Sequence, residues 1–127
     1  MQIRIVAGCV LLLFASAPLQ AAGLVWATTT LQADAAPGAR VVTFDFPFRN
    51  DGVGAVTLVS VDTSCRCLSV DLARATYAPG EKGDLRVAFS VGNQTGLLEK
   101  SVTVTTDEDR AIPVRLVLRL TVADKRP

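Results

Sequence analysis

Hydrophobic residues recur at every second position over most of this chain, and this alternation constrains the fold more than any other feature. In residues 112–122, six aliphatic side chains share one face of an extended chain, from Ile112 to Val122. Arg115, Arg119 and Thr121 fall on the opposite face. A helix would mix these two sets around its surface, because its side chains repeat every 3.6 residues rather than every two. The segment is therefore predicted to be a half-buried β-strand.

Further segments upstream repeat the pattern. The clearest contain Phe44, Leu85 and Val102, and a run from Val56 to Val61 changes phase in the middle, which indicates a β-bulge. Weaker strands are expected at 24–31 and 67–72. Loop signals separate these runs, at Pro37-Gly38, Asn50-Asp51-Gly52, residues 78–83, residues 92–96 and the acidic run 107–109.

About seven strands at these intervals predict a single immunoglobulin-like antiparallel β-sandwich. The length of 127 residues agrees with one domain. No stretch has a helical stripe. The alternation places four aromatic side chains in the core rather than on a ligand-binding surface: Phe44, Phe46, Phe48 and Phe89.

The N-terminus has the organisation of a secretory signal peptide. Arg4 supplies a short basic region, 13 uncharged and mostly apolar residues follow at 5–17, and Pro18 interrupts them. Cleavage is expected after Ala21 or Ala22, leaving residues 22–127 as the exported domain. The apolar run is shorter than the roughly 20 residues that a membrane-spanning helix needs, so no stable transmembrane segment is expected after cleavage. The expected location is periplasmic or secreted.

Composition excludes several classes of function. The chain has no histidine, which rules out Ser-His-Asp and Cys-His catalytic arrangements. Removal of Arg4 with the signal peptide reduces 13 basic residues to 12, equal to the 12 acidic ones. Such a balance gives no reason to expect a nucleic-acid partner, because those proteins concentrate basic charge. Asp107, Glu108 and Asp109 lack the spacing of a calcium loop and are interpreted as a solvated hairpin tip.

Cys65 and Cys67 are the only cysteines left after export. In a fully extended strand their Cα atoms would lie about 6.7 Å apart, at the limit of about 6.8 Å for a disulfide, so a turn or bulge at Arg66 would favour the bond. Three interpretations remain open: a structural disulfide or thiol pair, a Cu(I) site formed by two soft sulfur ligands, and a thiol-redox pair. A four-ligand zinc site would need ligands from a second chain.

The order of several short motifs resembles a bacterial family of immunoglobulin-like domains of unknown function, marked by a Ser-Cys-Gly-Cys-Thr motif and similar to ASH, MSP and Hydin domains. The matching segments are Phe46–Gly52, Ser64–Cys67, Pro79-Gly80-Glu81 and Thr105–Asp107. Arg66 and Leu68 replace the Gly and Thr of the family motif, and Arg66 lacks the backbone freedom of a glycine. The resemblance implies an exported structural or interaction module and no known enzyme activity.

These observations predict an exported, non-catalytic module that acts through protein partners, without a cofactor. The alternative is a small periplasmic Cu(I)-binding or thiol-redox protein that uses Cys65 and Cys67, and it requires both sulfur atoms to be accessible and reducible.

Overall fold

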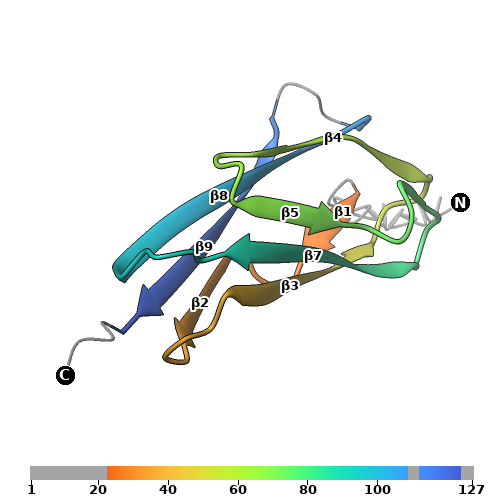
Figure 1. Ribbon diagram of the computed structural model, residues 1–127. Helices are drawn as coiled ribbons and strands as arrows, with labels where there is room; N and C mark the ends of the chain where they lie inside the picture. Colours follow the sequence, from red (N-terminus) through yellow and green to blue (C-terminus); the bar gives the residue numbers. More distant parts are fainter. Residues whose placement is uncertain (1–22, 109–111, 124–127) are drawn as a thin grey trace, which may run out of the picture.

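The computed structural model describes residues 23–108 and 112–123, which form two β-sheets packed face to face (Figure 1). The predicted signal peptide, its cleavage site and Asp109 lie outside the described residues. The strands are β1 (Leu24–Trp26), β2 (Thr30–Ala35), β3 (Val41–Asn50), β4 (Val56–Thr63), β5 (Leu68–Asp71), β6 (Thr76–Tyr77), β7 (Lys82–Ser90), β8 (Gly96–Thr106) and β9 (Val114–Val122).

Sheet A has the strand order β1-β3-β7-β5, and sheet B has the order β2-β9-β8-β4-β6. All pairs are antiparallel except β2 with β9, which is parallel. Every pair of consecutive strands changes sheet except β8 and β9, which are neighbours in sheet B. The predicted all-β, immunoglobulin-like sandwich is confirmed.

Three details differ from the expectations drawn from the sequence. The weak strand expected at 24–31 is divided, because the chain leaves sheet A after Trp26 and joins sheet B at Thr30. The two-residue strand β6 was not anticipated. The last strand begins at Val114 rather than Ile112, in keeping with the intervening Pro113, which has no N–H to contribute to a ladder. The bulge expected in β4 is confirmed by a register shift between Leu58 and Ser60.

The core lies between the sheets and follows the predicted alternation. Its largest buried members include Phe46, Phe89 and Tyr77, each no more than 1% exposed. All four phenylalanines expected in the core are buried there: Phe44, Phe46, Phe48 and Phe89. Pro47 is tolerated within β3 because the backbone groups of that residue point toward β1 and not toward the long ladder with β7. The Pro47 carbonyl accepts a hydrogen bond from Ala27 N at 3.0 Å.

One corner of the sandwich is closed by Asn50, the only polar or charged residue that is buried in the part of the chain that the structure describes. Its Nδ2 donates to the carbonyls of Gly54 and Tyr77, both at 2.9 Å, and its Oδ1 accepts from Gly52 N at 3.0 Å. Since Tyr77 belongs to sheet B and Asn50 to sheet A, this side chain joins the two sheets. Phe48 packs edge-on against the Tyr77 ring at 4.8 Å between centroids.

Candidate functional site

The Cys65-Arg66-Cys67 segment forms the turn where the chain crosses from β4 in sheet B to β5 in sheet A. The Cα atoms of Cys65 and Cys67 are 5.1 Å apart, and their Sγ atoms are 2.07 Å apart, at bonding distance. The turn brings the Cα atoms closer than an extended strand would. The strand expected at 67–72 accordingly begins one residue later, at Leu68. Both cysteines are half-buried and Arg66 is exposed.

Hydrogen bonds anchor this turn on both sides. Ser64 exchanges two bonds of 2.9 Å with Ser101 of β8, one through its backbone N–H and one through its hydroxyl oxygen. The carbonyl of Cys67 accepts from Ser90 N of β7 at 2.8 Å. Within the turn, Leu68 N donates to the carbonyl of Cys65 at 3.2 Å. None of these bonds involves a cysteine sulfur, so the turn has anchors that do not depend on the state of the thiols.

Strand β5 leaves an open backbone edge beside the turn. It is the terminal strand of sheet A and pairs only with β7 in the described part of the chain. Pairing residues in an antiparallel ladder alternate between exchanging hydrogen bonds and pointing their backbone groups away. Because Ser90 N bonds to the Cys67 carbonyl, Ser69 and Asp71 face β7. The N–H and C=O of Val70 therefore point to the free edge.

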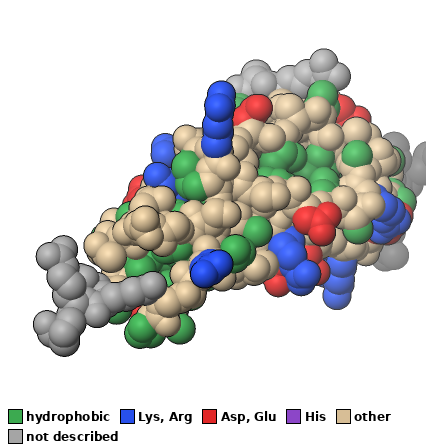
Figure 2. Space-filling view, in the orientation of Figure 1, with side chains coloured by type: hydrophobic (Ala, Val, Ile, Leu, Met, Phe, Trp, Pro, Cys, Tyr) green, Lys and Arg blue, Asp and Glu red, His purple; other side chains and the backbone are tan. Residues whose placement is uncertain are grey.

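The side of the sandwich between β4 and β5, here called the β4/β5 side, is partly apolar. Val61, Val70 and Leu72 are half-buried and pack against the core, and Val59 is 44% exposed at the bulge of β4. Hydrophobic side chains reach the surface in this region of the space-filling view (Figure 2). The free edge of β5 is thus flanked by apolar side chains on one side and by the cysteine turn at its beginning.

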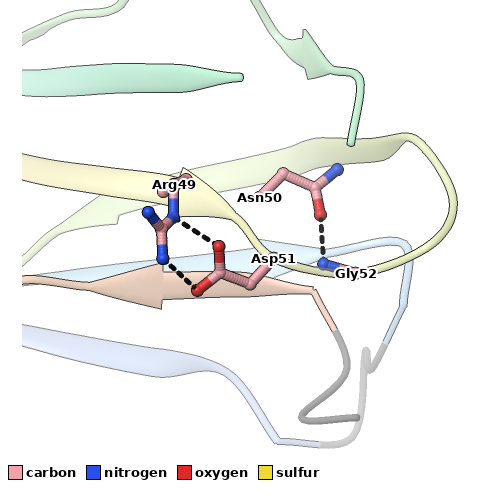
Figure 3. A network of polar contacts seen from close by, with 4 residues as sticks. All are labelled: Arg49, Asn50, Asp51 and Gly52. Carbon is pink, nitrogen blue, oxygen red and sulfur yellow. Dashed lines mark hydrogen bonds and ion pairs between the residues drawn. The ribbon is translucent and has the colours of Figure 1, made fainter. Parts of the chain in front are cut away.

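The opposite edge of sheet A has a different character. A shallow groove of about 270 Å³ is lined there mainly by Val25, Ala27 and Pro47, with Arg49 and Asp51 at its rim. Arg49 forms an ion pair with Asp51 (Figure 3). The hydrogen bond to this carboxylate and its charge raise the pKa of Arg49 above its usual value. Because Arg49 and Asp51 are already paired with one another, a charged ligand at this groove would have to compete with that ion pair.

No cluster of three or more His, Cys, Asp or Glu side chains is placed to hold a metal ion within residues 23–108 and 112–123. The two predicted site residues, Cys65 and Cys67, lie together, but the described chain brings no third ligand of these types to them. Asp107 and Glu108 are exposed, and Asp107 Oδ1 accepts from Thr57 N at 3.0 Å, which is a structural use for this side chain. The described residues contain no helix long and apolar enough to cross a bilayer.

Comparison with known proteins places the sandwich in a family. The profile of the family described as "Protein of unknown function (DUF1573)" matches residues 24–122, which is most of the chain. The chain belongs to the DUF1573 family. This membership agrees with the resemblance inferred from the motif order, and no curated protein shows significant sequence similarity to the chain.

Solved structures share the fold at low identity. A protein of unknown function from Porphyromonas gingivalis W83 matches with a TM-score of 0.68 and 19% identity, over 85% of this chain and 50% of that one. The ASH/PapD-like domain 7 of human CEP192 gives 0.60 and 8%, over 82% and 87%. The periplasmic chaperone SfaE gives 0.59 and 14%, over 83% and 61%. Parts of larger hydrolases also match, at 10–16% identity.

These likenesses identify the fold of this DUF1573 domain and not its activity. The chain spans about half the length of the P. gingivalis protein.

Three features of the structure were not predicted from the sequence: the free edge of β5 beside the cysteine turn, and, at the Asn50 corner and beside it, the buried role of Asn50 and the position of Arg74. The guanidinium of Arg74 lies 5.0 Å from the Tyr77 ring centroid and pairs with Glu81. Only the Asn50-Asp51-Gly52 signal hinted at any of them, and it indicated a turn rather than a bridge between sheets.

Proposed function

We propose that this DUF1573 domain is an exported, non-catalytic module that binds protein partners by adding an extended segment of the partner to the free edge of β5. The observation that carries the proposal is the unpaired N–H and C=O of Val70 beside the apolar β4/β5 side. Backbone hydrogen bonds at a sheet edge supply affinity in this binding mode, and neighbouring side chains supply specificity.

The surroundings of β5 suit such a partner. Other edges carry features that discourage strand addition, such as the three-residue β1, the two-residue β6 and the bulge in β4. On β2, the Thr28 hydroxyl accepts from Thr30 N at 3.3 Å and donates to the Thr30 carbonyl at 2.8 Å, which occupies one pair of outward groups. Strand β5 has four residues and no proline, lysine or arginine.

Selection of extended peptides from a displayed library on the purified domain tests this mode. A Val70→Pro variant removes the outward N–H without breaking a bond to β7, and Val70→Ala shortens the side chain while keeping that N–H. Peptides selected on the native domain should lose at least about tenfold in affinity on Val70→Pro, and less on Val70→Ala. Equal binding to all three proteins would contradict strand addition at β5.

Export and the absence of catalysis are separate parts of the proposal. Production with the native N-terminus in a bacterial host should give periplasmic protein that begins at Ala22 or Gly23, as measured by intact mass. Retention of residues 1–21 on cytoplasmic protein would contradict export. Reproducible turnover of a substrate by the purified domain would contradict the non-catalytic assignment.

Cu(I) binding is a weaker candidate. With the two sulfur atoms bonded to one another no thiolate is free, and the described residues bring no third ligand of the His, Cys, Asp or Glu types. Reduced protein titrated with Cu(I) distinguishes the two functions, because tight uptake of one ion per chain, lost in the Cys65→Ser/Cys67→Ser variant, would favour the metal.

A further inference from the structure

The sulfur atoms of Cys65 and Cys67 have unequal surroundings. The backbone N–H of Cys67 donates to Sγ of Cys65 at 3.1 Å. When a disulfide opens, one sulfur leaves with the electron pair as a thiolate, and an N–H donor aimed at that sulfur stabilises the charge. The exposed Arg66 lies between the two cysteines in the sequence and does not distinguish them. The Cys67 N–H favours Cys65 as the sulfur that carries the negative charge.

The turn is also built to survive the opening of the bond. The bonds from Ser64 to β8 and from Ser90 N to the Cys67 carbonyl use no sulfur atom, so opening the disulfide does not by itself remove them. A bond between residues two apart closes so short a loop that it restricts the unfolded chain less than a longer loop would. The fold therefore has little need of this bond as a brace, and reduction leaves the two thiols held near one another.

We propose that Cys65–Cys67 is a thiol–disulfide exchange site whose substrate is a pair of cysteine thiols of a bound polypeptide. A thiolate of the partner attacks Sγ of Cys67 and forms a mixed disulfide, while the Cys65–Cys67 bond breaks and its electron pair moves to Sγ of Cys65. A second partner thiolate then attacks the partner sulfur of the mixed disulfide and releases Cys67 as a thiolate. The partner loses two electrons and two protons in total, and the pair in this domain gains them as two thiols.

The choice of a polypeptide substrate rests on the proposed function, because the turn lies at the start of the β5 edge where the partner would lie. The exchange chemistry itself does not rest on it. Both cysteines are half-buried rather than buried, which leaves an approach for an incoming sulfur. Reduced glutathione therefore serves as a probe of exchange that needs no β5 binding.

The first experiment identifies the sulfur that is attacked. The oxidised mature protein is treated briefly with reduced glutathione, the free thiols are blocked with N-ethylmaleimide at low pH, and trypsin cleaves after Arg66 to separate the two cysteines. Mass spectrometry should find glutathione on Cys67 at least about threefold more often than on Cys65. Equal labelling, or a preference for Cys65, would overturn the assignment.

The second experiment compares the single variants Cys67→Ser and Cys65→Ser, each with one free thiol. Cys65 in the first variant should react with iodoacetamide at pH 6 about threefold or more faster than Cys67 in the second, because it has the larger thiolate fraction. Circular dichroism of the reduced native chain should show the fold retained. Equal rates, or unfolding on reduction, would contradict the proposal. Failure of peptide binding with intact exchange would instead refute the β5 mode alone.

Discussion

Two regions of this sandwich use polar groups in opposite ways. At the Asn50 corner every hydrogen-bonding group of a buried amide side chain is occupied, and the bonds connect β3, the following loop and β6. At the β4/β5 side the N–H and C=O of Val70 have no strand partner among the described residues. Two half-buried cysteines, Cys65 and Cys67, lie in the turn before this strand. The corner holds the sheets together, while the β4/β5 side keeps groups available to a partner.

The difference teaches where this small domain concentrates its stability. A buried polar group without a partner is costly, so the Asn50 network must be complete or absent. The backbone N–H and C=O groups at a sheet edge carry no such cost, because water forms hydrogen bonds with them in place of a neighbouring strand. Substitutions at the corner should therefore reduce the free energy of unfolding strongly, and changes at the β4/β5 side should affect binding or exchange more than stability.

The largest effect is expected from Asn50→Ala. The change removes the donors to the carbonyls of Tyr77 and Gly54 and the acceptor for Gly52 N. With the buried carbonyl of Tyr77 left unpaired, we expect a loss of about 3 kcal/mol in the free energy of unfolding, measured by urea denaturation. Asp51→Ala, at the exposed neighbouring position, is the control and should cost less than about 0.5 kcal/mol. Similar losses for both variants would show that the corner is not special.

A smaller effect is expected from Gly83→Ala. A Cβ atom at Gly83 would lie 2.6 Å from both Phe48 Cζ and Tyr77 Cε1. These rings are buried, so they must shift, and we expect a loss of about 2 kcal/mol. Gly54→Ala is the matched control, because a Cβ there meets nothing within 4 Å. A Gly83→Ala domain as stable as the Gly54→Ala domain would show that the ring pair is loosely packed.

The sequence predicted much of the fold because burial of one sheet face imposes a period of two. The β4 bulge and the four core phenylalanines followed from that period alone. The division of the first predicted strand into β1 and β2 could not be predicted from this period. Hydrophobic alternation is the same in both sheets, so it does not show that the chain changes sheet at residues 27–29. The two-residue β6 is too short to show any period.

The candidate site was predicted only in part. The pair Cys65 and Cys67 was visible as a motif, and a turn at Arg66 was recognised as the geometry that favours a bond. The contact between the Cys67 N–H and Cys65 Sγ depends on the conformation of the turn, and which backbone groups of β5 remain free depends on the register with β7. Register is a property of two segments and is set by tertiary packing, so neither segment reveals it by itself.

The smallest effect on stability is expected when both thiols are removed. Cys65→Ser/Cys67→Ser should lower the free energy of unfolding by about 1.5 kcal/mol, roughly half the loss for a 15-residue loop, because the closed loop is very short. Native protein kept reduced is the control and should unfold at nearly the same urea concentration as the double variant. A loss above about 3 kcal/mol would make the turn a structural brace comparable to the Asn50 corner. A loss within the expected range would show that the fold does not depend on the bond as a structural brace.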